Sequence, residues 1–224
     1  MKKELTPRTY LYPMPTVIVA CRVGTKPNFS TVSYCGVIQH APPMLTITMG
    51  KTHYSNEGIK QHGCFSVNIP SEQMLGVVDY IGLNSGAQVD KSRIFKCFYS
   101  KLSDAPLIED CPVNLGCKLV GTLDYGGLND IFVGEIVFAY AEESCMSNGF
   151  PDISKIKPIV FSMHDNKYWK IGEELAQAWE VGKSYQPPSL PPPLRPVPAK
   201  TENGRSANNS PAEKLAKANG KSAH

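Results

Sequence analysis

The sequence has few charged residues, and this limits the kinds of partner that the protein can bind. Only 19% of the 224 residues are charged, and the formal net charge is +3. Residues 184–224 hold six basic and two acidic side chains, a net charge of +4, so residues 1–183 carry −1. The first 183 residues therefore offer no basic surplus to neutralise a nucleic-acid backbone, and we expect no nucleic-acid partner.

The sequence also lacks a long apolar run and a regular cysteine framework. The apolar run Val17–Cys21 is too short for a signal-peptide core or a membrane span. The seven cysteines are an odd number, and no two have the CxxC spacing. This usage is typical of a reducing compartment, so we expect a cytoplasmic protein with no membrane partner.

Several common catalytic and metal-binding motifs are missing. There is no GxGxxG, GxxxxGK[ST], HExxH or GxSxG segment, which argues against most hydrolases and nucleotide kinases. The five histidines have no metal-ligand spacing to one another or to cysteine, so we expect no metal site. The pairs Glu142-Glu143 and Glu173-Glu174 are best interpreted as solvated surface charge, so no catalytic acid or base is predicted.

What the sequence does contain, from residue 16 to about 172, is the pattern of a β-rich domain. Segments rich in Val, Ile, Thr, Phe and Tyr, some of them alternating, are separated by proline and glycine. Because no strand-helix-strand alternation recurs, an antiparallel barrel or sandwich with peripheral helices is favoured over a parallel sheet. The predicted strands are Thr16–Val23, Asn28–Gln39, Met44–Met49, Cys64–Ile69, Val113–Tyr125, Ile131–Ala141, Pro158–Met163 and Tyr168–Ile171.

Two short helices and one turn are predicted between these strands. In Ser71–Gly82, apolar residues recur at helical spacing from Met74 to Ile81 and predict a stripe facing the core. Thr52–His62 has Thr52 and Ser55 as candidate N-caps and Gly63 placed to end the helix. A further short turn is predicted to begin at Asp90.

The chain beyond residue 183 has a different composition. Eight of the 19 prolines lie there, and large apolar residues are few. Residues 184–224 are therefore predicted to be a basic, disordered tail with polyproline II character and at most a marginal helix over residues 210–220. Its PxxP pattern could dock on an aromatic groove, although a plain linker is the simpler interpretation.

One polar cluster stands out in the β-rich domain. The segment 51–55, Lys-Thr-His-Tyr-Ser, opens a predicted helix directly after a strand. Hydroxyl groups, a cationic side chain and free backbone N–H groups meet there at the positive end of a helix dipole, which suits a phosphate. Ordinary helix capping by Thr52 and Ser55 explains the same residues.

Several short motifs, taken together in their order, resemble the flavin reductase-like, FMN-binding split-barrel family, and within it the flavoredoxins. The similarity extends over about residues 5–183. The motifs are Lys26-Pro27-Asn28, Thr31, Tyr34, Gly36, Pro42-Pro43, Tyr54-Ser55, FSVNIPSE at 65–72, Asp79–Gly82 with Ser85-Gly86 and Asp90-Lys91, and FVGEI at 132–136.

This resemblance implies a mainly β (α+β) fold: a six-stranded antiparallel split β-barrel with peripheral short helices. It also implies a homodimer that binds FMN non-covalently near its interface. Lys51, Thr52 and Ser55 would hold the phosphate, and the ring would lie against residues 31–36. The implied FMN site comprises Asn28, Thr31, Ser33, Tyr34, Cys35, Gly36, Lys51, Thr52, Ser55, Asn68, Ser85, Gly86, Asp90 and Lys91.

Some of these residues also have structural interpretations. Asn68 could be a strand-end turn residue and Asp90 an N-cap. Cys35 could be a small buried side chain instead of a redox thiol.

The function implied by the resemblance is that of a flavoprotein oxidoreductase. Electrons would pass from NAD(P)H or a reduced ferredoxin-like protein through FMN to a flavin, a ferric chelate or a redox protein. Because a flavin carries the electrons itself, the absence of a catalytic triad is expected. Two alternatives remain: an FMN-containing electron carrier that does not oxidise NAD(P)H, and a flavin-free split barrel that serves as an interaction module.

Overall fold

The computed structural model describes residues 1–188. The chain divides into two units, Met1–Glu173 and Glu174–His224. All the strands described below belong to the first unit, and the described part of the second, residues 174–188, holds only the 3₁₀ turn η3, Val181–Ser184. The predicted domain boundary after residue 183 stays a prediction, and the predictions for residues 189–224 lie outside the described residues.

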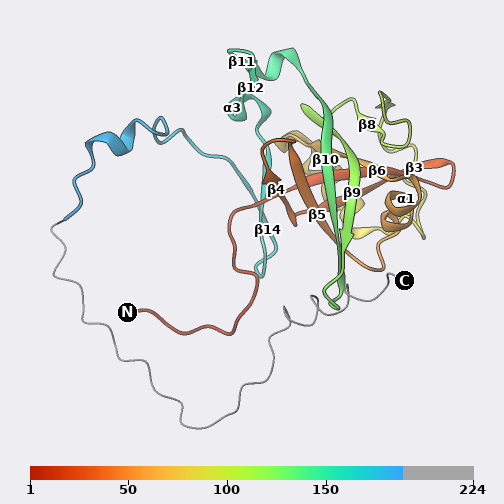
Figure 1. Ribbon diagram of the computed structural model, residues 1–224, viewed down its shortest axis with the longest axis horizontal. Coiled ribbons are helices and arrows are strands. Elements are labelled where there is room, and N and C mark those ends of the chain that lie inside the picture. Colours follow the sequence, from red (N-terminus) through yellow and green to blue (C-terminus); the bar gives the residue numbers. More distant parts are fainter. Residues whose placement is uncertain (189–224) are drawn as a thin grey trace, which may run out of the picture. The chain divides into compact units, whose positions relative to one another are not determined.

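The first unit is built around one antiparallel sheet, so the mainly β prediction is confirmed. Its seven strands lie in the order β3-β2-β6-β9-β10-β5-β4, and Figure 1 shows β9 and β10 as long neighbouring strands. These strands are β2 (Val17–Val23), β3 (Lys26–Val32), β4 (Cys35–Gln39), β5 (Met44–Gly50), β6 (Cys64–Ile69), β9 (Val113–Leu123) and β10 (Asn129–Ala141).

The two ends of this sheet are joined in sequence. β3 is the first strand in the sheet order and β4 the last, yet only Ser33 and Tyr34 lie between them. The sheet must therefore curl until its edges approach each other, which makes a barrel that is split between β3 and β4. Tyr34 holds this corner, because its carbonyl accepts a hydrogen bond from the amide of Thr48 at 2.8 Å.

This corner corrects one detail of the sequence prediction. Asn28–Gln39 was expected to be one strand, but the structure divides it into β3 and β4. The main sheet therefore has seven strands where the resemblance implied six.

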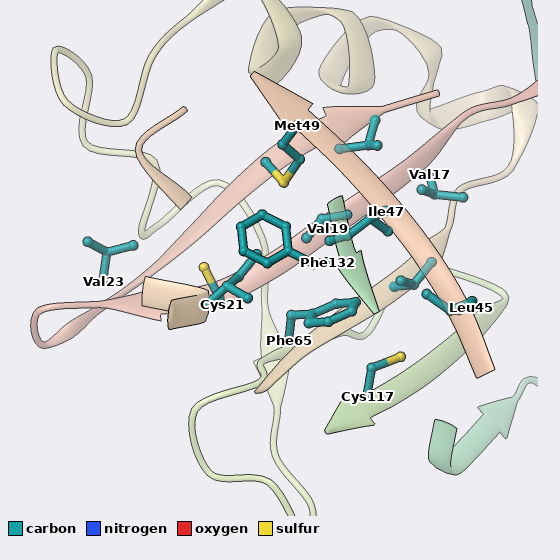
Figure 2. Packing of buried hydrophobic residues seen from close by; sticks show 13 residues of the cluster. Val17, Val19, Cys21, Val23, Leu45, Ile47, Met49, Phe65, Cys117 and Phe132 are labelled. Carbon is teal, nitrogen blue, oxygen red and sulfur yellow. The ribbon is translucent and has the colours of Figure 1, made fainter. Parts of the chain in front are cut away.

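The strand residues alternate between two apolar clusters. Val17, Val19 and Cys21 of β2 point into the barrel, where they pack with Ile47, Phe65, Phe132 and others (Figure 2). Ile18 and Ala20 of the same strand point to the opposite face. Both faces of β2 are buried, and each large side chain removed from water contributes about 1.5–3 kcal/mol.

The two longer helices pack against different clusters of the sheet, and the first ends where the sequence predicts. Gly63 ends α1 (Ser55–His62) with φ +63°, a conformation that favours glycine, and its amide binds the carbonyl of Ile59. The 3₁₀ turn η1 (Glu72–Met74) leads into α2 (Leu75–Leu83), which buries Val78 and Ile81 against the outer cluster. The predicted apolar stripe of this helix is confirmed.

The start of α1 differs from the prediction. Neither Thr52 nor Ser55 caps the helix: Tyr54 is the N-cap residue and makes no side-chain cap hydrogen bond. Ser55 is instead the first helical residue, and its side chain points into the protein interior.

The remaining elements form small additions to the first unit. The turn after Asp90 is confirmed, since the Asp90 carboxylate accepts a hydrogen bond from the amide of Ser92 at 2.9 Å. Among residues 1–188, no helix has the length and apolar character needed to cross a lipid bilayer. The additional elements are β1 (Met14–Pro15), β13 (Ile159–Ser162) and β14 (Lys167–Lys170) in one sheet, the pairs β7 (Cys97–Phe98) with β8 (Leu107–Ile108) and β11 (Met146–Ser147) with β12 (Phe150–Pro151), and the short helices η2 (Glu143–Cys145) and α3 (Ile153–Ile156).

Candidate functional site

A polar pocket of about 280 Å³ lies between β3, the turn before α1, and the end of α2 with the loop that follows it. It brings together five of the residues predicted as cofactor contacts: Thr31, Thr52, Ser85, Gly86 and Lys91. The other lining residues were not predicted: Ser30, His53, Tyr54, Ile81, Gly82, Leu83 and Asn84.

Lys91 gives this pocket a buried positive charge. Only 4% of the residue is exposed, and its ammonium group donates hydrogen bonds to the carbonyls of Phe29 at 2.9 Å and Ile81 at 2.7 Å. Burial lowers the pKa of Lys91, because the charged form is partly removed from water. None of the lining residues is acidic, so the pocket offers this ammonium no counter-charge.

His53 lies at the exposed rim of the same pocket and is the most informative residue that the sequence argument missed. Its amide binds the carbonyl of Gly50 at 2.9 Å, which closes the turn between β5 and α1. Partial desolvation and the positive charge of Lys91 lower the pKa of His53. The only signal in the sequence was its position between Thr52 and Tyr54 in the predicted phosphate segment.

A layer of hydrogen bonds supports the pocket from behind. Ser55 is completely buried, and its hydroxyl is 2.8 Å from both the amide nitrogen of Asn28 and the hydroxyl of Ser30. Both predicted residues, Asn28 and Ser55, therefore bind each other and do not line the pocket.

Gly86 allows the loop after α2 to approach this layer closely. A Cβ atom at position 86 would lie 2.1 Å from the side-chain oxygen of Asn28 and 2.7 Å from the ring of Tyr54. A side chain at this position would push the loop away and open the pocket.

A second, mainly apolar cavity of about 650 Å³ lies beside the barrel corner. Ser33, Tyr34 and Cys35, all predicted as ring contacts, form one wall. The N-terminal segment Arg8–Pro15 forms the other. The hydroxyl of Tyr34 donates to that of Thr9 at 3.3 Å, so the two walls are in contact.

Two further contacts describe the surroundings of this cavity. The hydroxyl of Tyr12 donates to the carbonyl of Met163, and the rings of Tyr10 and His164 lie 5.0 Å apart. These contacts hold the N-terminal segment against the β13–β14 hairpin. Burial raises the pKa of the Cys35 thiol to about 11, which keeps it protonated near neutral pH.

Besides Asn28 and Ser55, four predicted residues line neither cavity. The ammonium of Lys51 pairs with Asp124 at 2.7 Å, Gly36 is exposed on β4, and Asp90 pairs with Lys26 at 2.6 Å. Asn68 is fully buried. Its amide oxygen accepts hydrogen bonds from the backbone of Ile108 and the side chain of Asn114, which is a structural role.

The donor set of the two cavities fits a phosphorylated planar ligand. Hydroxyl groups and an ammonium without an acidic neighbour suit a phosphate, and apolar walls suit a planar ring. Thr31 lines the polar pocket and Ser33 lines the apolar one. In an extended chain, two residues at positions i and i+2 point to the same side and lie about 7 Å from each other. Within residues 1–188, no group of three or more His, Cys, Asp or Glu side chains could hold a metal ion.

The family can be assigned from residues 9–157, which match the sequence model described as the flavin reductase like domain. The chain belongs to the flavin reductase-like family. The matched segment includes β2 to β10, every residue of the predicted FMN site and all the residues that line the two cavities except Arg8.

Solved structures agree with this assignment. The flavoredoxin from Methanosarcina acetivorans is 41% identical, with a TM-score of 0.80, and the match covers 82% of this chain and 98% of that one. The flavoredoxin of Desulfovibrio vulgaris (Miyazaki F) is 31% identical, with a TM-score of 0.76, over 81% of this chain and 100% of that one. An FMN-binding protein from Thermus thermophilus, at 20% identity and a TM-score of 0.67, covers 79% of this chain and 97% of its own, and shows the shared fold alone.

Proposed function

We propose that this protein binds FMN and acts as an FMN-dependent oxidoreductase of the flavin reductase type. The observation that carries the proposal is the buried ammonium of Lys91 in a pocket without acidic residues, next to an apolar cavity at the barrel corner. A phosphate would supply the missing counter-charge, and the apolar cavity would take the ring.

The polar pocket would hold the phosphate through the hydroxyls of Thr52 and Ser85 and the charge of Lys91. Lys91 is held in place by the carbonyls of Phe29 and Ile81, so its charge is fixed before a ligand arrives. Ser55 and Asn28 would act one layer behind, by fixing the floor beneath the ligand.

The residues at the barrel corner would orient the ring and keep water from one side of it. Ser33, Tyr34 and Cys35 would supply a wall on the protein side, and Arg8–Pro15 would supply the outer wall. Bound FMN itself accepts and releases the electrons, so no acid-base pair is needed from the chain.

The electron donor would be NAD(P)H or a reduced ferredoxin-like protein, and the acceptor a flavin, a ferric chelate or a redox protein. The two flavoredoxin relatives favour one second candidate, an FMN-containing carrier that does not itself oxidise NAD(P)H. Reduction by NADH or NADPH separates the two functions, because only the reductase would be reduced by the nucleotide alone.

We also propose that two copies of the chain form a homodimer. The edge strand β4 exposes Val37 and Ile38, which are 80% and 53% accessible, and the β9–β10 hairpin exposes Leu123 and Leu128. An edge strand with apolar side chains is a favourable surface for a second copy. Light scattering at micromolar concentration should give the mass of two chains, while Val37→Lys should shift the mass toward one chain.

The FMN proposal is tested by titrating the flavin-free protein with FMN and with riboflavin. The fluorescence of FMN should be quenched when it binds. FMN should also bind at least about tenfold more tightly than riboflavin, because riboflavin lacks the phosphate that would contact Lys91. Lys91→Gln should reduce this preference and leave riboflavin affinity almost unchanged. Equal affinities for the two flavins in the unmodified protein would contradict the phosphate pocket.

A further inference from the structure

The rim of the polar pocket holds a titratable group that the FMN proposal does not use. His53 lines the pocket together with the buried ammonium of Lys91. Its ring lies against the end of β5, since a Cβ atom on Gly50 would be 3.2 Å from the His53 ring carbon Cδ2. The imidazole is therefore positioned by the turn before α1, at the mouth of a pocket suited to an anion.

The titratable and charged groups around His53 come from only a few elements. Its own turn contributes Tyr54, and the loop after α2 contributes Lys91, whereas β3 and the end of α2 contribute hydroxyl and apolar side chains to the pocket. At the end of β5, Lys51 is paired with Asp124, and Asp130 on β10 is paired with Lys60. Lys91 is thus the charged neighbour inside the pocket, and it disfavours a proton on His53.

A phosphate in the pocket reverses this balance. Without ligand, partial desolvation and Lys91 keep the pKa of His53 below its ordinary value of 6.5. A phosphate monoester has a second pKa near 6, so it is mainly a dianion at pH 7.5. Two negative charges beside one ammonium leave an excess of negative charge, which favours the protonated imidazole.

We propose that His53 is a phosphate-binding residue that takes up a proton from solvent when the FMN phosphate enters the pocket, and that this makes the site selective for phosphorylated flavin over riboflavin. The inference rests on the proposed function, because it needs FMN in this pocket. Between zero and one proton is taken from solvent per FMN bound; it forms an N–H bond on the imidazole, and no covalent bond of FMN changes.

The direction of the pH effect follows from these charges. The pKa of His53 is lowered in the free protein, and the proposal raises it in the FMN complex. The part of the FMN affinity that depends on His53 therefore increases as the pH falls from the pKa of His53 in the complex toward its pKa in the free protein. Riboflavin carries no phosphate, so its affinity has no His53-dependent change in this range.

Isothermal titration calorimetry tests the proposal on the full-length protein freed of flavin by dialysis. FMN and riboflavin are titrated at pH 7.5 in two buffers of different ionisation enthalpy, which gives the number of protons bound with each flavin. The variant is His53→Asn, and the control is His40→Asn, which changes an exposed histidine outside both cavities.

The expected result is proton uptake with FMN and none with riboflavin, in both the unmodified protein and the control. His53→Asn should lose the uptake and about tenfold in FMN affinity, with riboflavin affinity unchanged. FMN binding without proton uptake, or with the same uptake in His53→Asn, would overturn the role of His53 and leave the FMN site standing. A failure of the unmodified protein to bind FMN would overturn the proposed function itself.

Discussion

The side-chain amide of Asn28 donates a hydrogen bond to the hydroxyl of Ser55 at 2.8 Å, so β3 is tied directly to the first turn of α1. Ser55 is completely buried and Asn28 is 5% exposed. The pair lies behind the polar pocket, and Ser30, which does line the pocket, also contacts the Ser55 hydroxyl at 2.8 Å. The two residues therefore support the proposed phosphate site from its interior side.

Ser55→Ala should destabilise the protein and weaken FMN binding. The substitution leaves the buried amide of Asn28 without its acceptor, at a cost of about 1–3 kcal/mol. Urea denaturation measures the loss of stability, and flavin titration measures the loss of affinity. Ser144→Ala, at an exposed serine, serves as the control and should change neither. Unchanged stability in Ser55→Ala would mean that the Asn28–Ser55 bond is unimportant to the pocket floor.

Gly86→Ala should reduce FMN affinity by opening the pocket. The added methyl group would lie 2.1 Å from the Asn28 oxygen, so the loop must move. Gly76→Ala is a matched control, because a Cβ atom there meets nothing within 4 Å and the helix α2 gains about 0.5–1 kcal/mol. Fluorescence titration with FMN measures the FMN affinity of both variants. Equal FMN affinities in the two variants would show that the loop does not contact the ligand.

The Cys35 thiol should take no part in electron transfer. Because burial raises its pKa to about 11, only about one molecule in a thousand carries the thiolate at pH 8. Cys35→Ser should therefore leave the rate of flavin reduction unchanged. Peptide mapping after alkylation should find Cys35 unmodified at pH 8, with reactivity rising as the pH approaches 11. A large loss of flavin reduction in Cys35→Ser would assign the thiol a redox role.

The N-terminal segment should shield the ring site from solvent. A variant that lacks residues 1–11 removes Arg8–Leu11 from the outer wall of the apolar cavity and keeps Tyr12 bound at Met163. Its bound flavin should be quenched more strongly by iodide than the flavin of the full-length protein. The control Leu5→Ala alters an exposed residue among the deleted residues 1–11 that lines neither cavity. Identical quenching in the truncated and full-length proteins would place the ring elsewhere.

The sequence predicted those parts of the fold that depend on local pattern. The bounds of β6 agree with the prediction at both ends, and Gly63 ends α1 as expected, because alternation and a left-handed glycine are local signals. The break at Ser33-Tyr34 was missed, because the corner is held by a hydrogen bond to Thr48 on another strand.

The site was predicted only in part for the same reason. Lys91 was assigned to the cofactor site through the resemblance, but its burial depends on carbonyl groups 62 and 10 residues away. Lys51 and Ser55 both looked suited to a phosphate in sequence. The pairing of Lys51 with Asp124 and the pairing of Ser55 with Asn28 are tertiary contacts that no local pattern contains.

The most direct test of the central claim is a visible absorption spectrum of the freshly purified protein, recorded before and after anaerobic addition of NADH and then NADPH. The account predicts that the protein shows flavin absorption bands and that these bands bleach with at least one nucleotide. The flavin released from the protein should have the spectrum of free FMN. Bands that persist with both nucleotides but bleach with a reduced ferredoxin would identify a carrier in place of a nucleotide-dependent reductase. A colourless protein that does not bind added FMN would contradict the account.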